Sequence, residues 1–179
     1  ERLARAVYDE VMAPVGRQRF VLHPEFRIDG DGDTYMLEYA FRNGGGLNPG
    51  RIQDTTGVDV YRYAALATLG APGDYRVDSG RFGGSGYQMI FADRPGTFLG
   101  IEGLDDGSDD VEIIPEKERG TEIRTPHMDV LAYVIARGAS AEVVEARLDD
   151  VVRGAEVIVL TRAKVPVSEL RVESESGDT

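Results

Sequence analysis

The feature that most constrains this chain is a pair of alternating segments around an aspartate–glycine loop at residues 29–33. Before the loop, apolar residues share one parity across Pro24: Phe20, Leu22, Phe26 and Ile28. After the loop they recur at every second position: Tyr35, Leu37, Tyr39 and Phe41. Alternation on both sides of a turn-forming sequence predicts a β-hairpin with one buried face. We expect residues 18–42 to form this hairpin and the first half of the chain to pack against its apolar face.

The rest of the first half is less regular. Apolar residues spaced four apart predict a helix over residues 1–12. Residues 43–57 predict a loop, because three consecutive glycines and an Asn-Pro-Gly tripeptide disfavour regular structure. The sequence VDVYRY at residues 58–63 predicts a strand, and AALATL at residues 64–69 predicts either a helical turn or more of the loop.

The middle of the chain predicts a series of short strands, because β-branched and aromatic residues alternate there with Pro- and Gly-rich turns. The expected strands are Tyr75–Asp78, Tyr87–Ala92, Thr97–Glu102, Val111–Ile114 and Thr121–Arg124.

The last third changes to helical spacing. Thr125 and Pro126 are good first residues of a helix, and Ser140 is a good cap for a second helix that would stop at Gly154. The first of these helices would carry an apolar stripe of Val130, Leu131, Val134 and Ile135. The apolar run in residues 156–163 predicts a buried strand.

Strands followed by helices predict an α+β fold. We expect a mostly antiparallel sheet of short strands, with an N-terminal helix and two C-terminal helices packed on one face. No internal repeat or second apolar core divides the sequence. We therefore expect a single domain over residues 1–172 and a polar C-terminal tail over residues 173–179.

The charge balance excludes several classes of partner. There are 32 acidic and 20 basic residues, a net charge of −12, and only Lys117 and Lys164 are lysines. This composition is typical either of proteins from salt-adapted organisms or of a genome that codes arginine in place of lysine. A nucleic-acid surface needs clustered basic residues, and none are present. No apolar run reaches the roughly 18–20 residues that span a membrane, no signal-peptide pattern indicates secretion, and no cysteine is present for thiolate chemistry.

One cluster of residues is a candidate metal site. Asp29, Asp31 and Asp33 alternate with glycine or follow it, so their carboxylates can converge on a hard cation such as Ca²⁺. A helix-flanked calcium loop would need glycine at its sixth position and glutamate at its twelfth, where this sequence has Thr34 and Ala40. We favour a solvated acidic turn and keep calcium binding as the alternative.

Other segments do not complete a catalytic motif. The acidic loop at residues 105–110 favours a solvated connection, and the glycine stretch at residues 80–86 lacks the lysine and helix of a phosphate loop. His23 and His127 have no partner that the sequence identifies. Six tyrosines on expected strands favour cross-strand pairing or a subunit interface: Tyr35, Tyr39, Tyr61, Tyr63, Tyr75 and Tyr87.

We therefore expect no catalytic residues, no cofactor and no enzymatic activity. The favoured function is a structural or assembly subunit that binds copies of itself or other subunits, such as a head, neck or tail protein of a virion from a salt-adapted host, located in the virion or the cytoplasm. The alternatives are a divalent-cation-dependent enzyme that uses the acidic loops at 29–33 and 105–110, and a module that binds a small ligand among the tyrosines.

Overall fold

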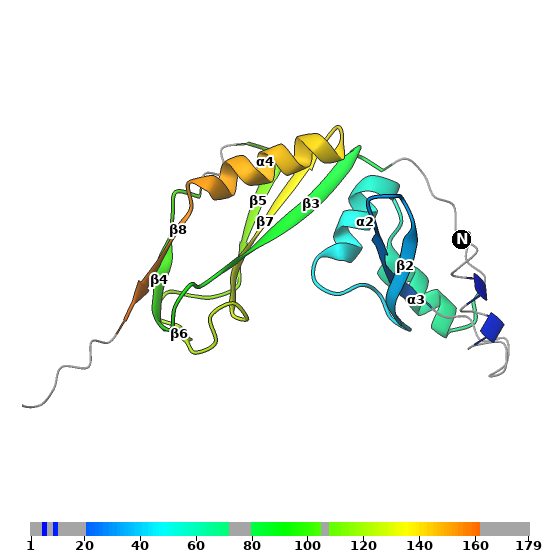
Figure 1. The fold of residues 1–179 in the computed structure, drawn as a ribbon, viewed down its shortest axis with the longest axis horizontal. Helices are drawn as coiled ribbons and strands as arrows, with labels where there is room; N and C mark the ends of the chain where they lie inside the picture. Colours follow the sequence, from blue (N-terminus) through cyan, green and yellow to red (C-terminus); the bar gives the residue numbers. More distant parts are fainter. Residues whose placement is uncertain (1–4, 7–8, 11–20, 72–79, 105–107, 162–179) are drawn as a thin grey trace, which may run out of the picture.

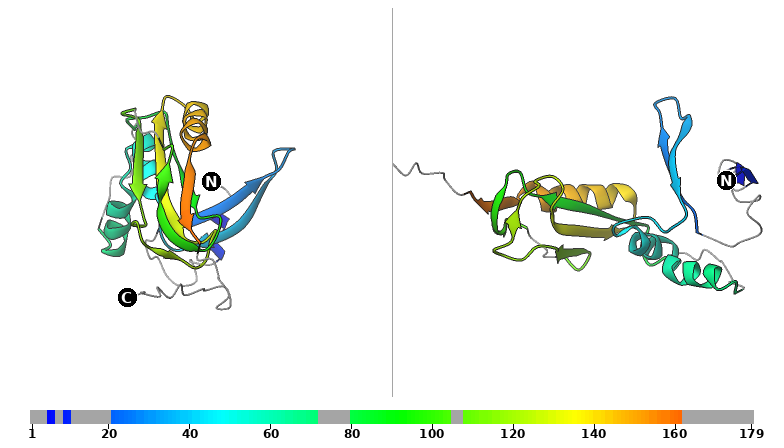
Figure 2. Two further views of the ribbon diagram at one scale, coloured as in Figure 1. Left: turned by 90° about the vertical axis from the view of Figure 1, so that its left-hand side faces the viewer. Right: turned by 90° about the horizontal axis from the view of Figure 1, so that it is seen from below.

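The N-terminal hairpin is present. The computed structural model describes residues 5–6, 9–10, 21–71, 80–104 and 108–161. Strand β1 (His23–Ile28) pairs antiparallel with β2 (Thr34–Ala40) across the aspartate–glycine turn, as the alternation predicts. In Figure 2 this hairpin stands apart from the two sheets formed later in the chain.

The prediction of one buried hairpin face is wrong. Tyr35 and Leu37 are 55% and 64% exposed. Next to the turn, Phe26 lies opposite Met36 and Tyr35 lies opposite Arg27. Because cross-strand partners share a face, Phe26 and Tyr35 lie on opposite faces of the hairpin, so the apolar side chains do not form one buried face.

Two helices replace the loop and strand predicted next. Helix α2 (Asn48–Thr56) has proline in its first turn and ends at Gly57, whose left-handed φ of 71° terminates it. Helix α3 (Val60–Thr68) begins after Asp59, whose carboxylate accepts a hydrogen bond from the Arg62 backbone N–H at 2.9 Å. The loop prediction for residues 43–57 and the strand prediction for residues 58–63 are therefore wrong.

The rest of the described chain contains two three-stranded antiparallel sheets and one helix. The first has the order β3-β7-β5, formed by Gly84–Phe91, Val130–Gly138 and Val111–Pro115. The second has the order β6-β4-β8, formed by Glu122–Ile123, Gly96–Glu102 and Glu156–Leu160. The predictions of β3, β4, β5, β6 and β8 are confirmed apart from their ends. The predicted strand Tyr75–Asp78 lies outside the described residues.

The predicted helix after Pro126 is wrong, because this segment forms β7, the central strand of its sheet. Its apolar residues are buried on both faces, among them Leu131, Val134 and Ile135. Such a run satisfies a buried strand as well as a helix stripe. His127 has a left-handed φ of 68°, which interrupts any helix at its expected first turn.

The second predicted helix is confirmed as α4 (Ala141–Arg153), with Ser140 accepting a hydrogen bond from the Val143 N–H. In Figure 1 it lies along the β3-β7-β5 sheet. Glycines allow this approach: a Cβ on Gly86 would lie 3.0 Å from Val144, and one on Gly138 would lie 2.9 Å from Val143. The fold is thus α+β, with helices at 48–68 and 141–153 in place of two C-terminal helices. Most of the predicted N-terminal helix lies outside the described residues, as does the tail.

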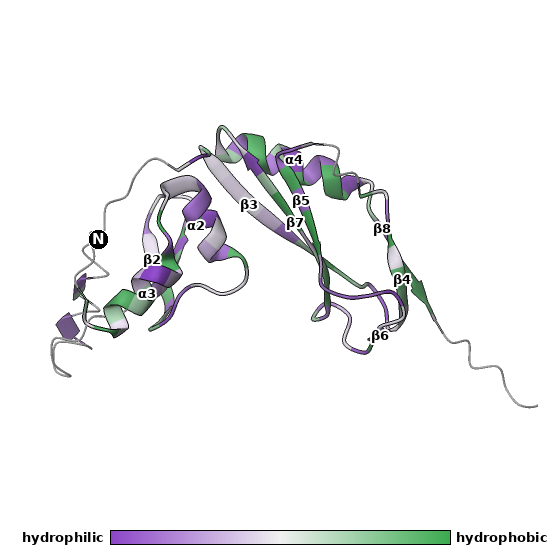
Figure 3. Ribbon diagram, turned by 180° about the vertical axis from the view of Figure 1, so that it is seen from behind, coloured by the Kyte–Doolittle hydropathy of each residue, from purple (hydrophilic) through white to green (hydrophobic). Residues whose placement is uncertain are grey.

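A buried apolar cluster of Ala92, Phe98, Ile123 and Leu131 joins β7 of the first sheet to β4 and β6 of the second. Figure 3 shows hydrophobic residues running along β5 and β7, whereas α4 shows both hydrophobic and hydrophilic positions. In the part of the chain that is described, no helix is long and apolar enough to cross a membrane.

Replacement of the fully buried Leu131 tests this core. Leu131→Ala should lower the free energy of unfolding by about 2–5 kcal/mol, because it removes buried methyl groups and leaves a cavity. The matched control is Leu69→Ala, at a leucine that is 79% exposed, which should change it by less than about 0.5 kcal/mol. Urea unfolding measures both variants, and equal losses would contradict this assignment of the core.

The N-terminus of α4 predicts a pH effect. The hydrogen bond with the Ser140 side chain, followed by a backbone hydrogen bond, lowers the pKa of Glu142. Because the pKa of Glu142 is lower in the folded state than in the unfolded state, its ionised carboxylate stabilises the fold at pH values above the unfolded pKa of about 4.3. This stabilisation is lost as the pH falls through the folded pKa, where the carboxylate becomes protonated. Ser140→Ala should remove the cap and lower the free energy of unfolding by about 1 kcal/mol. The variant should also lose less stability than the original protein when the pH falls below ~4.3. Urea unfolding between neutral and acidic pH measures this change, and an unchanged acid response would refute it.

Candidate functional site

Two glutamates face each other across the hairpin. Glu25 of β1 lies directly opposite Glu38 of β2 in the strand register. Like charges at opposed positions repel each other and destabilise a strand pair. His23 Nε2 lies 3.2 Å from Glu25 Oε1, which provides partial compensation when the imidazole is protonated. A cation held between the two carboxylates would reduce this repulsion.

A second opposed pair, Glu102 and Glu156, joins β4 and β8. The pKa of Arg94 is raised, first by its hydrogen bond with Asp93 and to a lesser extent by attraction to Glu156. The second pair therefore provides an internal comparison for the pair on the hairpin.

The chain after Glu38 continues into Arg42 and then into residues 43–47, which we call the glycine loop. Arg42 follows β2 and donates a hydrogen bond from Nη1 to the Asn43 carbonyl oxygen at 2.9 Å. Gly44 lies against the imidazole of His23, where a Cβ would be 3.0 Å from the ring carbon Cε1. The glycine loop therefore rests on the same strand that presents Glu25.

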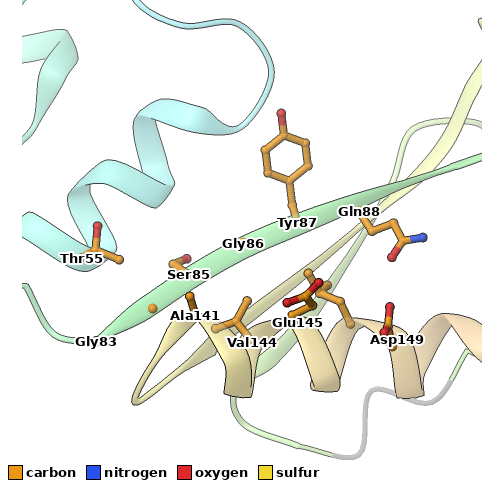
Figure 4. Close-up of a pocket in the computed structure, with 12 residues that line it drawn as sticks. Thr55, Gly83, Ser85, Gly86, Tyr87, Gln88, Ala141, Val144, Glu145 and Asp149 are labelled. Carbon is orange, nitrogen blue, oxygen red and sulfur yellow. The ribbon is translucent and has the colours of Figure 1, made fainter. Parts of the chain in front are cut away.

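The other end of this loop contacts the first sheet. Gly46 has a left-handed φ of 60°, and a Cβ there would lie 2.7 Å from the Tyr87 hydroxyl oxygen. Tyr87 packs edge-on against Tyr133 of β7, with ring centroids 5.9 Å apart, and points away from α4 (Figure 4). The glycine loop thus lies between His23 of the hairpin and Tyr87 of β3.

A polar junction fixes α2 to the same sheet. Asp54 Oδ2 accepts hydrogen bonds from Ser85 Oγ at 2.7 Å and from Arg137 Nε at 3.1 Å, and lies 2.9 Å from Arg51 Nη2. Arg137 Nη2 also donates to Glu112 at 2.8 Å. Burial acts to lower the pKa of Arg137, but its bonds to Glu112 and Asp54 outweigh burial, so the pKa is raised and the guanidinium stays charged.

A cleft of about 720 Å³ runs along the opposite side of β3, between this strand and α4. In Figure 4, Glu145 and Asp149 extend from α4 beside it, and Thr55 and Ser85 lie at the end near α2. Apart from these polar groups its lining includes glycine backbone and the apolar side chains Val144 and Leu148.

The predicted metal ligands at the hairpin tip have a role in the turn. The Asp29 Oδ1 atom accepts hydrogen bonds from the backbone N–H groups of Asp31 and Asp33, at 3.0 and 2.9 Å. Among the described residues, no three histidine, aspartate or glutamate side chains come together as a metal cluster. Calcium binding by Asp29, Asp31 and Asp33 stays a prediction.

The structure places the remaining candidates at separate positions. Within the acidic loop at 105–110, Asp110 bonds to Arg147 at 3.0 Å, and residues 105–107 lie outside the described part. His127 is exposed, and its backbone N–H donates to the Ala92 carbonyl oxygen. Tyr61 and Tyr63 belong to α3 and not to a strand.

Sequence reasoning missed Glu25, Arg42, Asp54 and Arg137. Asp54 and Arg137 are far apart in the sequence, so no local pattern reveals that they form an ion pair. The opposition of Glu25 and Glu38 depends on a register shift that the hairpin pattern does not reveal.

The comparisons with known proteins give this arrangement a context. Residues 88–159, from within β3 to within β8, match the family model of the L-amino acid ligase C-terminal domain 2. No curated protein matches the chain.

Solved structures extend the likeness beyond those residues. The L-amino acid ligase from Bacillus licheniformis matches with a TM-score of 0.67 and 23% identity, over 90% of this chain and 44% of that one. The chain shares its fold with an L-amino acid ligase. Phosphoribosylglycinamide synthetase from Anaerococcus prevotii follows with a TM-score of 0.61 and 18% identity, over 78% and 37% of the two chains.

A third similar structure contains a nucleotide. The biotin carboxylase domain of the Hydrogenobacter thermophilus 2-oxoglutarate carboxylase, in complex with MgADP, ADP and bicarbonate, matches with a TM-score of 0.58 and 21% identity, over 78% and 32% of the two chains. This chain therefore spans less than half the length of each of these three enzymes.

These matches overturn the predicted function. The favoured interpretation was a non-enzymatic structural subunit, such as a virion protein of a salt-adapted host. The family match is to a ligase domain, and the similar folds come from a ligase, a synthetase and a carboxylase. The prediction that the chain is not an enzyme is wrong for the same reason, and the enzyme alternative was the better one.

The packing of Gly46 against Tyr87 can be tested directly. Gly46→Ala should lower the free energy of unfolding by about 1–2 kcal/mol from its left-handed backbone alone, with a further loss from the overlap with the Tyr87 hydroxyl. Gly32→Ala is the matched control, because Gly32 also has a positive φ of 86° but a Cβ there would meet no atom within 4 Å. Tyr87→Phe should reduce the excess loss in Gly46→Ala. Equal losses at both glycines in urea unfolding would contradict the contact.

Proposed function

We propose that the chain is part of an ATP-dependent ligase of the ATP-grasp class that joins L-amino acids. The observation that carries this proposal is the match of residues 88–159 to the L-amino acid ligase C-terminal domain 2. The shared fold with the Bacillus licheniformis enzyme, over 90% of this chain, supports it. A ligase of this kind fits a location in the cytoplasm.

The hairpin and the glycine loop provide residues suited to a magnesium nucleotide. Mg²⁺ is commonly bound through one or two carboxylates together with substrate phosphates, so the pair Glu25 and Glu38 fits it without a third protein ligand. Arg42 lies just beyond Glu38 in the chain, and arginine matches the geometry of phosphate oxygens. The glycines that follow leave backbone N–H groups open to an anion.

In this proposal Glu25 and Glu38 hold the magnesium ion, and Arg42 and the glycine loop hold phosphate groups. The bound metal would stabilise the negative charge on the phosphate oxygens while a phosphoryl group is transferred. MgADP in the Hydrogenobacter thermophilus structure supports the choice of ion and nucleotide. The chain's own residues then bind and orient the nucleotide.

The proposal also gives a role to the exposed hairpin. Both of its faces carry exposed apolar side chains, including Ile28 and Leu37. The similar ligase has a chain about twice as long as the part that matches. We propose that another part of the enzyme covers these faces. Association with copies of itself or with other subunits stays a prediction.

Magnesium-dependent ADP binding tests the proposed site. Isothermal titration of the full-length protein should detect ADP binding that strengthens with Mg²⁺. Glu25→Gln and Glu38→Gln should each weaken this binding about tenfold, which corresponds to about 1.4 kcal/mol, because each removes one charged metal ligand. The protein should also release ADP from ATP only when L-amino acids are present.

The second opposed pair is the control for this experiment. Glu102→Gln and Glu156→Gln should leave MgADP binding unchanged, since this pair lies on β4 and β8 and not on the hairpin. The proposed site is wrong if all four variants bind MgADP like the original protein. The proposed activity is wrong if no L-amino acid stimulates the release of ADP.

A further inference from the structure

We propose that Asp54 and Arg137 are positioning residues for the nucleotide site. Between them they hold helix α2, and with it the glycine loop and Arg42, against the β3-β7-β5 sheet. The identity of the ligand, a magnesium nucleotide at the glycine loop, rests on the proposed function. The contacts that support it lie in the structure itself.

Helix α2 has little apolar anchorage of its own. Pro49 is its only buried residue among those described, and Ile52 is exposed. A helix of nine residues is too short to be stable without tertiary contacts. The position of α2 therefore depends on its polar contacts, and most of these converge on Asp54.

The backbone around Asp54 reinforces this anchor. The Phe82 N–H donates to the Asp54 carbonyl oxygen at 3.1 Å, and the Gly80 N–H donates to the Thr55 carbonyl oxygen at 3.1 Å. The side chain of Asp54 reaches β3 through Ser85 and β7 through Arg137. The C-terminal turn of α2 is thus attached to β3, which leads into the segment that matches the ligase domain, and to β7, which lies within that segment.

The N-terminal end of α2 leads directly to the proposed site. The glycine loop immediately precedes the helix, with Gly44 against His23 and Gly46 against Tyr87. His23 in turn lies 3.2 Å from Glu25. Because the loop packs closely on both sides, a displacement of α2 would move the loop relative to Glu25.

The charges at the junction make Asp54 difficult to replace. The Arg51 side chain is only 13% exposed, and its buried Nε and Nη1 atoms have no hydrogen-bond partner among the described residues. Without Asp54, two guanidinium groups would remain close together, with only Glu112 paired to one of them. Their repulsion would push α2 away from β7.

The test compares Asp54→Ala and Asp54→Asn with Asp150→Ala in the full-length protein. Asp150 forms a similar helical pair with Arg153, three residues away at 3.1 Å, but on the exposed surface. Titration of MgADP gives the dissociation constant of the folded protein, and urea unfolding gives its stability. Amide hydrogen exchange compares residues 43–47 with residues 156–160 of β8.

Asp54→Ala should raise the dissociation constant for MgADP about tenfold or more. Asp54→Asn should restore part of the affinity, since its amide oxygen still accepts hydrogen bonds, and Asp150→Ala should match the original protein. Amide exchange in Asp54→Ala should speed up at residues 43–47 and stay unchanged in β8. The Arg137→Ala variant should show the same pattern.

Two results separate this inference from the proposed function. If Asp54→Ala is less stable but binds MgADP as tightly as the original protein, with unchanged exchange at residues 43–47, the role of Asp54 is structural only and the inference is overturned. If the original protein does not bind MgADP, the proposed function fails. Faster exchange confined to residues 43–47 would then still support the positioning role, and unchanged exchange would overturn it.

Discussion

The arrangement of this molecule depends on one carboxylate shared by two arginines. Asp54 joins α2 to β3 and β7, and Arg137 extends the junction to Glu112 of β5. Arg147 of α4 continues it, because it bonds both to Asp110 and to the backbone carbonyl of Arg137. Partly buried ion pairs lose much of their attraction to desolvation. Their effect here is to specify how a helix, a sheet and a second helix meet, while the apolar core stabilises the sheets.

Local chemistry explains which elements the sequence could predict. The hairpin, the short strands of the middle region and α4 each have turn or cap residues beside their own periodic segment, such as Ser140 before α4. Strand β7 lacks this clarity, because Leu131, Val134 and Ile135 satisfy helical spacing and a strand buried on both faces equally well. Only its pairing with β3 and β5 decides between them.

Glycine and proline misled the prediction for α2 in an instructive way. Their number in residues 43–57 suggested a loop, yet their positions are those of a helix start and stop. Pro49 lies in the first turn, where its missing N–H costs no hydrogen bond, and Gly57 takes the left-handed conformation that ends the helix. The positions of proline and glycine within the segment therefore indicated a helix, whereas their number indicated a loop.

The proposed site was harder to predict than the fold, because its residues meet through pairing and not through a motif. The aspartates at the tip were conspicuous in sequence, yet Asp29 uses its carboxylate to close the turn. Glu25 and Glu38 became a pair only once the register was known. Judging catalysis by local motifs therefore favoured a structural protein, although the residues that we propose for a nucleotide are distributed over two strands of a hairpin and the loop that follows it.

The hairpin exposes apolar side chains on both of its faces. A two-stranded hairpin is marginally stable by itself, and a large exposed apolar surface is typical of an interaction site. The strands that present Glu25 and Glu38 have such side chains on both faces. The metal ligands that we propose there would need to be held in a fixed geometry, which a lone hairpin does not provide. The alternation predicted a buried face, but Tyr35 and Leu37 are exposed in the described chain. Coverage of the hairpin by another part of the enzyme, as we propose, would account for this difference.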